Sequence, residues 1–432
     1  MRAMLGYDAQ EERTLGASTN ITPGEEWRRF WYLPLVAALG YTSAGLQIYS
    51  IGPFVGPLQH EFGWTRAEIF SGLTIANGAG AIFNLLIGWF VDRIGPRRVG
   101  LIGVLLISSA IALLGTATGT AGNWAFLWCL IAVGFLWVQP TTWSSAVASR
   151  FDASRGLALG VTLSGVSLSA YMLPLLSTWL IDSYGWRNAF FGLGLIWAAV
   201  LFPILFLFFR GRQDSSARAG PRYVPAAAHF DGLSPGEALR TSAFYKLLAA
   251  GSFFALTMMG LVTNLVPLLT DTGTDRATAA SIASLIGLFA IMGRLSTGFL
   301  LDRLPGHFVG AGAFLLPIFG SALLLWPDAG TIGHAVAAAI IGLSLGSELD
   351  ALTFLSMRYF GLRSFGKLYG GLLVAVSIGT AAGPLVAGAV FDHFGSYDVF
   401  LMLAIACMAI SAIALLSLRG SREFRPVAAA AI

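Results

Sequence analysis

Charged residues are scarce in this sequence, and the deficit extends along the whole chain. Only 11% of the 432 residues are Asp, Glu, Lys or Arg, whereas 56% are hydrophobic. A soluble protein carries roughly 25% charged residues. The composition therefore excludes an ordinary soluble domain and indicates a protein that crosses a membrane several times.

Other absences narrow the class of protein further. The two cysteines, Cys129 and Cys407, both lie in apolar stretches, so neither a disulfide framework nor a metal site is indicated. The net charge is +4, but no Lys/Arg cluster stands beside base-stacking aromatics, which argues against nucleic acid. The sequence has no Gly-rich phosphate loop with a Lys-Ser/Thr ending and no catalytic constellation. We expect no enzyme, no cofactor and no ATP-driven step.

Long apolar stretches are what the chain does contain. A membrane-spanning helix needs roughly 20 mainly apolar residues, and about twelve segments qualify. The expected spans lie near residues 31–53, 67–91, 98–117, 122–148, 156–180, 188–209, 244–270, 277–301, 307–326, 331–357, 366–390 and 398–418. We therefore expect an all-α membrane protein with twelve spanning helices.

The polar segments divide these spans into two groups of six. We expect a loose tail at 1–26, a first bundle at 27–209, a polar linker at 210–243, a second bundle at 244–418 and a tail at 419–432. Within the linker, Ser234-Pro235-Gly236-Glu237 has the form of a capping box with Pro at the first helical position. It predicts a short helix shortly before the second bundle.

The Lys and Arg residues give an orientation. With the N-terminus inside, three of the 26 Lys and Arg lie in outside loops, Arg294 lies within a helix, and the other 22 lie inside. The reverse orientation would invert this bias, whereas cytoplasmic loops normally carry the excess. Both termini and the linker are therefore expected to be cytoplasmic, in a protein of the inner membrane.

Charged and turn-forming residues recur with an offset of 210. Asp92 and Arg93 return as Asp302 and Arg303. Further pairs are Pro57 and Pro267, Arg66 and Arg276, Gly88 and Gly298, Gly160 and Gly370, Pro174 and Pro384, Asp182 and Asp392, and Gly185 and Gly395. Two parallel repeats in a membrane, with a site between them, are the plan of a secondary transporter.

The loop between the second and third spans carries a motif. The segment from Gly88 to Arg98 reads Gly, three residues, Asp, Arg, one residue, Gly, one residue, and two Arg. It resembles the loop signature of the major facilitator superfamily, and this resemblance implies two pseudo-symmetric six-helix bundles that alternate access. The expected gating residues are Gly88, Asp92, Arg93, Gly95, Arg97, Arg98, Asp302 and Arg303.

A second block narrows the resemblance. Gly346-Ser347-Glu348-Leu349-Asp350 and Phe365-Gly366-Lys367-Leu368-Tyr369-Gly370 resemble the bacterial branch that includes oxalate/formate antiporters and monocarboxylate porters. This block marks the branch better than it marks the substrate.

Arg294 is the sharpest candidate for binding. It lies inside the eighth span, and its repeat mate is the neutral Asn84. A cation in a membrane is costly and usually functional, and a guanidinium pairs with a carboxylate bidentately. The resemblance implies a substrate arginine four residues before the loop glycine, as Arg294 stands before Gly298. The alternative is a structural arginine that pairs with an acidic residue.

Other site residues are expected at lower specificity. Glu348 and Asp350 are candidates for proton coupling, and a salt bridge with Arg294 is the structural alternative. Because they are two residues apart on one helix, they should not face the same cavity. Tyr41, Gln139 and Asn264 are candidate substrate contacts at mid-span, where ordinary interhelical hydrogen bonds are the alternative.

These observations predict a secondary transporter of a small organic anion. One buried cation favours a monocarboxylate, moved by proton symport or by exchange with a counter-anion. Two alternatives stay open, an exporter of a hydrophobic compound and a non-transporting membrane sensor with the same fold. The expected partners are the substrate, protons or a counter-anion, and the lipid bilayer, and we expect a monomer.

Overall fold

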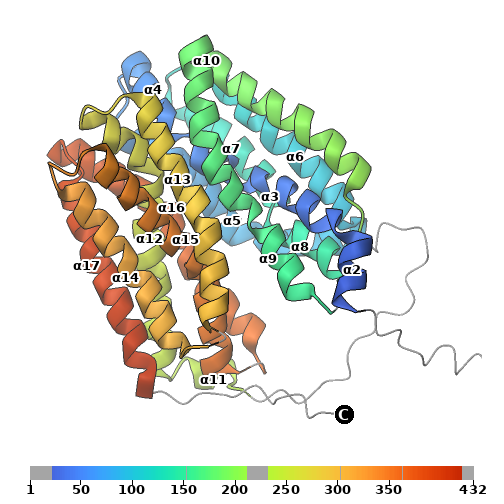
Figure 1. Cartoon of the computed structure of the whole chain (residues 1–432). Coiled ribbons are helices and arrows are strands. Elements are labelled where there is room, and N and C mark those ends of the chain that lie inside the picture. The colour runs from blue at the N-terminus through green and yellow to red at the C-terminus, as the bar shows by residue number, and fades with distance from the viewer. Residues whose placement is uncertain (1–21, 152, 212–231, 302, 362, 421–432) are drawn as a thin grey trace, which may run out of the picture.

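Two helical bundles make up the chain in the computed structural model (Figure 1). The structure describes residues 22–151, 153–211, 232–301, 303–361 and 363–420, and within these the side chains of 80–88, 92 and 419–420 lie outside the description. The described residues are almost entirely helical. The all-α membrane fold expected from the sequence is confirmed.

The first bundle begins with a short helix that precedes the first span. Its elements are α2 (Pro23–Phe30), α3 (Tyr32–Ser50), η1 (Gly52–Phe54), α4 (Val55–Phe62), α5 (Arg66–Ile94), α6 (Pro96–Leu113), η2 (Leu114–Thr116), α7 (Ala121–Trp137), α8 (Pro140–Ala148), α9 (Arg155–Leu163) and α10 (Gly165–Phe208). Gly185 has φ 77° and ψ 159°, a non-helical conformation that splits α10 into two successive helices. Such positive φ values suit glycine, which has no Cβ.

The second bundle repeats this plan. Its elements are α11 (Pro235–Ala238), α12 (Ser242–Asp271), α13 (Arg276–Leu301), α14 (Gly306–Leu325), α15 (Gly330–Phe360), α16 (Phe365–Phe394), α17 (Asp398–Leu416) and η4 (Ser417–Gly420). The helices α5 and α13 begin 210 residues apart, and so do α6 and α14. The repeat seen in the sequence is thus a repeat of helix boundaries.

The number of spans is consistent with twelve. Among the described residues, nine helical segments are long and apolar enough to cross a membrane. One of them, 155–208, contains the break at Gly185 and therefore holds two spans. The nine leave out α3 and α5, which occupy the places of the first two expected spans.

One boundary differs from the sequence expectation, and one local feature agrees with it. Helix α2 begins at Pro23, so residues 23–26, which we assigned to the loose tail, are helical and Glu26 is buried. The capping box at Ser234 is confirmed, and it opens α11. Short polar helices of this kind lack the apolar length that identifies a span, so their ends depend on capping and on tertiary contacts.

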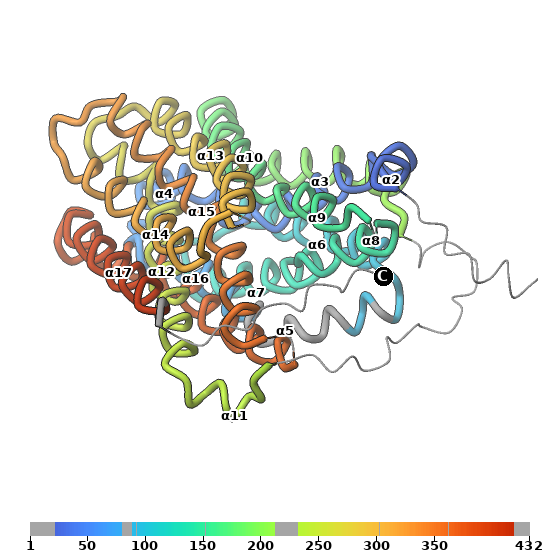
Figure 2. Tube along the Cα trace, turned by 60° about the horizontal axis from the view of Figure 1, so that its bottom comes forward, coloured from blue at the N-terminus to red at the C-terminus, as the bar shows by residue number. Residues whose placement is uncertain are grey.

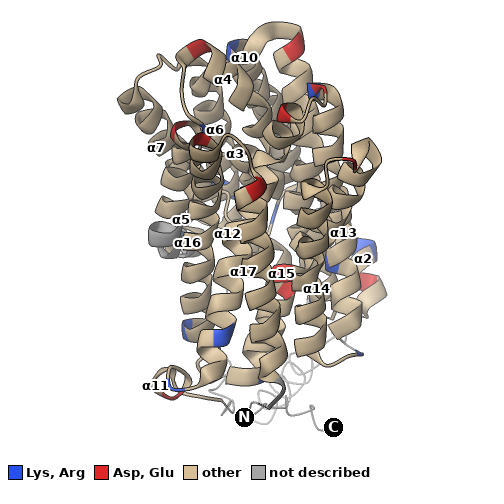
Figure 3. Cartoon of the chain, turned by 90° about the vertical axis from the view of Figure 1, so that its left-hand side faces the viewer, with Lys and Arg blue, Asp and Glu red and all other residues tan. Residues whose placement is uncertain are grey.

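The two ends of the bundles differ in composition. We call the end with α2, α11 and the loops at 149–154 and 361–364 the linker end, and the opposite one the far end. Acidic residues appear at the far end in Figure 3, opposite α11. In Figure 1 the two bundles are in contact at the far end, and their helices diverge toward the linker end. Figure 2 shows α14 and α17 of the second bundle on one side and α6 and α9 of the first bundle on the other.

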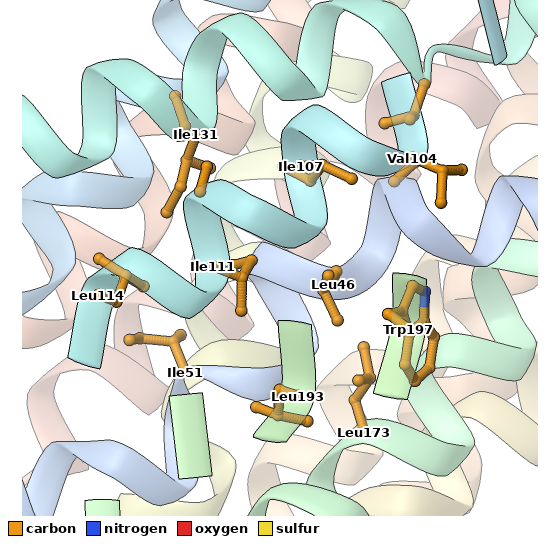
Figure 4. Packing of buried hydrophobic residues seen from close by; sticks show 14 of the residues in the cluster. Leu46, Ile51, Val104, Ile107, Ile111, Leu114, Ile131, Leu173, Leu193 and Trp197 are labelled. Atoms are coloured by element: carbon orange, nitrogen blue, oxygen red, sulfur yellow. The ribbon is translucent and has the colours of Figure 1, made fainter. Parts of the chain in front are cut away.

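Each bundle has its own apolar core. In the first core, Leu46 of α3 lies near Ile107 of α6 and Leu193 of α10 (Figure 4). The second core is built from α12 to α17, and Tyr49 of α3 packs against both cores. Between the bundles, α5 lies against α16 and α10 lies against α13. These four helices form the seam along which the halves meet.

Candidate functional site

Arg294 of α13 joins the two bundles at this seam. Its Nη1 donates a hydrogen bond of 2.6 Å to the backbone carbonyl of Leu163, which ends α9 in the other bundle. Its Nε lies 3.5 Å from Oδ2 of Asp350 on α15, in an ion pair. Nε has no hydrogen-bond partner among the described residues. The guanidinium therefore spans both halves and keeps hydrogen-bonding capacity.

The carbonyl of Leu163 is available because the fifth span is interrupted there. In a continuous helix the amide of residue 167 would bond to the carbonyl of residue 163. Here the amides of Ser167 and Leu168 both donate to the carbonyl of Ser164. Helix α9 ends at Leu163 and α10 begins at Gly165, so the Leu163 carbonyl is left without a partner in its own helix. Arg294 supplies that partner.

A glycine brings the acidic residue close to Arg294. A Cβ at Gly346 would collide with the backbone of Ala290 and of Arg294, so α15 and α13 approach each other at this point because position 346 has no side chain. Asp350 lies one turn further along α15, on the same face as Gly346. The close approach of the two helices thus positions the Asp350 carboxylate beside the guanidinium.

Two tyrosines of α3 lie near Arg294. Both Tyr41 and Tyr49 are within electrostatic range of the guanidinium, and Tyr49 is also within range of Glu348. The Tyr41 side chain is buried. The structure thus brings Tyr41 and Asp350 to Arg294, and it adds Tyr49, which is near both Arg294 and Glu348.

Both Glu348 and Asp350 are within electrostatic range of the Tyr369 phenol. The hydroxyl of Thr353 donates to that phenol at 2.7 Å. Glu348 is buried, and its Oε1 has no hydrogen-bond partner in the described part of the chain. Tyr369 was missed by the sequence reasoning, although it stands inside the second block of motif residues.

Two expected substrate contacts lie elsewhere. Gln139 is the residue at which α7 gives way to α8, and its side-chain amide donates to the Phe135 carbonyl at 3.3 Å. Asn264 donates to the Gly260 carbonyl and accepts a 2.7 Å hydrogen bond from the Tyr397 hydroxyl. The structure does not bring either side chain to Arg294, and their role in binding stays a prediction.

The gating residues are described in part. Asp302, the side chain of Asp92 and the burial of Gly88 lie outside the description. Gly95 separates α5 from α6 with φ 87°, which explains why glycine stands there. Among the arginines, Arg93 stacks on Trp89, Arg97 donates to the Phe206 carbonyl, Arg98 is exposed, and Arg303 stacks on Phe299.

A cluster at the far end was not foreseen. Arg66 begins α5 and donates to Asp271 at 2.8 Å and to the Tyr397 hydroxyl at 2.6 Å. The carboxylate of Asp392 accepts from the backbone amides of Arg66 and Ala67, at 2.9 and 2.8 Å. Sequence reasoning counted Arg66 and Asp392 as repeat landmarks. Each residue has a repeat mate at the same end of the molecule, and this shared location was the available signal that the two could lie close together.

The far end is closed and holds little free space beneath this cluster. A void of about 10 Å³ lies between Tyr49, Pro174, Thr263 and Ile286 of the two bundles. Above it, a cavity of about 420 Å³ opens at the far end and includes Arg66 and Asp271 in its wall. No group of three or more potential metal ligands occurs among the described residues.

The sequence is similar to known transporters over most of its length. The profile of the Major Facilitator Superfamily matches residues 37–370. Monocarboxylate transporter 13 of Rattus norvegicus is 27% identical over 322 residues, which cover 72% of this chain and 71% of the relative. The oxalate:formate antiporter of Oxalobacter formigenes is 26% identical over 409 residues, covering 92% and 93%.

A solved structure shares the fold. The crystal structure of a bacterial homologue of the human lysosomal transporter Spinster, in an inward-facing and unoccupied conformation, superposes with a TM-score of 0.68. The match covers 92% of this chain and 98% of that one, at 18% sequence identity. At this identity the likeness concerns the fold.

Proposed function

Since the chain belongs to the Major Facilitator Superfamily, we propose that it is a secondary transporter of a small monocarboxylate, with the linker end in the cytoplasm. Arg294 binds the carboxylate at the seam between the bundles. Asp350 carries the coupled proton, and Glu348 is a second acidic group of the same site. The protein is a transporter rather than an enzyme.

One observation carries the proposal. Arg294 is held by groups from both bundles, the Leu163 carbonyl and the Asp350 carboxylate. A carboxylate is a better partner for a guanidinium than a neutral carbonyl, because it carries the opposite charge and accepts two parallel hydrogen bonds. An anion that enters between the bundles therefore displaces the carbonyl and competes with Asp350. Binding of the anion is thus linked to the contact between the halves.

The same competition supplies the proton coupling. In the empty site the Asp350 carboxylate forms an ion pair with the Arg294 guanidinium, and the two charges cancel. When a substrate carboxylate takes the guanidinium, Asp350 loses its counter-charge in a low-dielectric setting, where an unpaired charge is costly. Uptake of one proton by Asp350 removes that charge. One carboxylate and one proton then move together, and the loaded site has the same net charge as the empty one.

The shape of the molecule supports an opening at the linker end. The far end is closed by the contacts of Arg66 with Asp271 and Tyr397, whereas the helices diverge toward the linker end (Figure 1). The excess of Lys and Arg in the linker-end loops favours the cytoplasm for that side. Access from the other side requires the contacts between α5 and α16, and between α10 and α13, to separate.

Binding and uptake by purified protein test the proposal. Labelled monocarboxylates are offered to proteoliposomes with and without a pH gradient, and binding is measured at equilibrium. Arg294→Lys keeps the charge but loses the planar fork, so we expect binding about tenfold weaker or more. Arg294→Ala should abolish binding. The matched control is Arg240→Gln, an exposed arginine at the linker end, which should bind as the wild type does.

Each alternative predicts a different result. An exporter of hydrophobic compounds would bind a neutral amide as well as its parent acid, and Arg294→Ala would not change that. A membrane sensor would bind the acid without saturable uptake. Unchanged carboxylate affinity in Arg294→Ala, at a thermal stability equal to that of the wild type, would remove the anion site and leave Arg294 as a structural residue.

A further inference from the structure

Helix α2 is attached to the protein through one acidic side chain. The Glu26 carboxylate accepts hydrogen bonds from the backbone amides of Ala153 and Ser154, both at 2.9 Å, and from the Ser154 hydroxyl at 2.7 Å. These donors lie directly before α9, so Glu26 caps that helix from another element. The ring of Trp27 packs edge-on against Phe151 and strengthens the attachment. Helix α2 and the start of α9 therefore behave as one body.

The face of α2 opposite Glu26 is exposed, and its side chains become less polar along the helix toward the first span. Arg28, Trp31 and Leu35 follow one another at helical spacing of three and four residues, and all three are exposed, Trp31 by 57% and Leu35 by 46%. Trp31 keeps right-handed helical angles, and its amide bonds to the Trp27 carbonyl, so the spacing holds across the join to α3. The order from the linker end into the span is a cation, an indole and an aliphatic side chain.

Side chains of membrane proteins follow the same order across the surface of a bilayer. Cationic side chains lie at the level of the headgroups, tryptophan lies at the interface, and aliphatic side chains lie in the hydrocarbon. Arg29 is exposed next to Arg28, and the guanidinium groups of Arg29 and Arg150 both lie 5.3 Å from the Phe30 ring. Glu25 is the acidic neighbour; its carboxylate accepts from the Thr22 amide and lies within electrostatic range of Arg28, which leaves Arg29 as the arginine without this neighbouring charge. This surface therefore suits anionic headgroups.

The unit formed by α2 and α9, which carries this surface, also reaches the proposed substrate site. Helix α9 runs from Arg155, beside the Glu26 cap, to Leu163, whose carbonyl receives the Arg294 guanidinium. Nine helical residues span about 13 Å at a rise of roughly 1.5 Å per residue. A displacement of α2 is transmitted along this short rigid element to one of the two partners of Arg294.

We propose that Arg28, Arg29, Trp31 and Leu35 form a binding surface for anionic phospholipids, with the arginines at the headgroups and Leu35 at the acyl chains, and that its occupation changes the substrate affinity of Arg294 through Glu26 and α9. The lipid surface itself is independent of what the protein transports. The second part rests on the proposed carboxylate site. Zwitterionic lipids present no net negative charge to the two arginines and leave the surface empty.

Lipid binding is measured without substrate. An environment-sensitive dye is attached at Gly24→Cys, where no atom lies near the added side chain, in a background with Cys129→Ala and Cys407→Ala. The protein is placed in nanodiscs of phosphatidylcholine with increasing phosphatidylglycerol. Each arginine near an anionic surface contributes roughly fivefold to affinity. We therefore expect a saturable dye response that weakens with added salt and is lost in the Arg28→Gln/Arg29→Gln variant.

The same assay includes a matched control and can contradict the proposed lipid surface. Arg240→Gln removes an exposed arginine at the same end, away from α2, and should respond as the wild type does. If the double variant responds to phosphatidylglycerol as the wild type does, the lipid surface is wrong. This result does not depend on any transported anion, so it is distinguishable from a failure of the proposed function.

Substrate binding in the same nanodiscs tests the coupling. For the monocarboxylate with the strongest uptake, we expect the dissociation constant of the wild type to change severalfold with phosphatidylglycerol. Glu26→Gln retains a side chain of the same size but loses the charge that caps two amides, so its dye should still respond while its substrate affinity no longer changes. A wild-type affinity that is independent of phosphatidylglycerol would overturn the coupling, and so would a Glu26→Gln affinity that still follows it.

Discussion

The far end is closed by two contacts that the repeat makes equivalent in sequence but that differ in strength. A shift of 210 residues relates Arg66 to Arg276 and Asp392 to Asp182. In the first contact, which we call the Arg66 cluster, Arg66 binds Asp271 and Tyr397 and lies 3.6 Å from the Phe391 ring centre. Its side chain is only 6% exposed.

The second contact, the Arg276 pair, is open to solvent. Nη1 of Arg276 lies 2.8 Å from Oδ1 of Asp182, and the side chains are 36% and 50% exposed. The repeat mate of Asp271 is Glu61, but Glu61 does not turn toward Arg276. It pairs at 3.2 Å with Arg187 of its own bundle.

The difference between the contacts depends on one position. The repeat mate of Arg187 is Tyr397. An arginine at this position holds the acidic residue inside its own bundle, whereas a tyrosine leaves Asp271 to pair with Arg66 across the seam. Burial raises the pKa of the Tyr397 phenol, so it stays protonated, accepts from Arg66 and donates to Asn264. The α5–α16 side is thus the firm closure, and the α10–α13 side is the weak one.

Removing Arg66 should have the largest effect on this closure. Breaking a buried ion pair costs about 3–5 kcal/mol, and the lower end applies because Asp271 is 35% exposed. A loss of about 3 kcal/mol shifts the ratio of open to closed far ends by roughly 150-fold. Spin labels at Gly122→Cys and Thr331→Cys, at the far-end starts of α7 and α15, report the population by distance measurement. We expect a longer distance to dominate in Arg66→Ala.

The interpretation fails if Arg66→Ala keeps the wild-type distance distribution. Arg66→Lys serves as the conservative control, since it keeps a cation for Asp271 but loses the second donor to Tyr397. It should fall between the wild type and the alanine variant. Transport rates should fall in the same order, from the wild type through Arg66→Lys to Arg66→Ala, because a far end that does not close interrupts the alternation of access.

A substitution at position 397 should convert the firm contact into a copy of the weak one. Tyr397→Arg places a second guanidinium beside Arg66, gives Asp271 a partner in its own bundle, and removes the donor to Asn264. We expect the closed far end to be destabilised by about 1–2 kcal/mol, which raises the ratio of open to closed far ends roughly tenfold. Tyr397→Phe removes only the hydroxyl and should cost about 1 kcal/mol. Equal distance distributions in Tyr397→Arg and Tyr397→Phe would show that the charge at 397 does not matter.

Much of the fold was predictable because it depends on local composition and on the repeat. The matching starts of α5 at Arg66 and of α13 at Arg276 follow from the sequence offset. The start of α2 was not predictable, because Glu26 is helical and buried through a contact with Ser154, which lies 128 residues away. A polar segment shows no hydrophobic period, so only the tertiary contact reveals its structure.

The site was predictable where a residue type is unusual in its setting. Arg294 stands out because a cation inside a span is costly. Its partner Leu163 does not stand out, because the partner is a backbone carbonyl released by a helix break, and any side chain can occupy such a position. Asn264 was singled out for its depth in the span, but its contact with Tyr397 depends on how α12 meets the start of α17.

The smallest effect is expected at the Arg276 pair. Exposed ion pairs contribute about 0–1 kcal/mol, because water and salt screen them and both side chains lose rotamer freedom. Arg276→Ala should therefore shift the far-end distance distribution by less than about fivefold in population, and this shift should vanish in high salt. A double-mutant cycle with Asp182→Ala isolates the pair and should give a coupling energy below about 1 kcal/mol. The same cycle on Arg66 and Asp271 should give a coupling at least twice as large. If the two coupling energies are equal, the two sides of the seam do not differ in strength in solution. Opening of the far end would then have no preferred side.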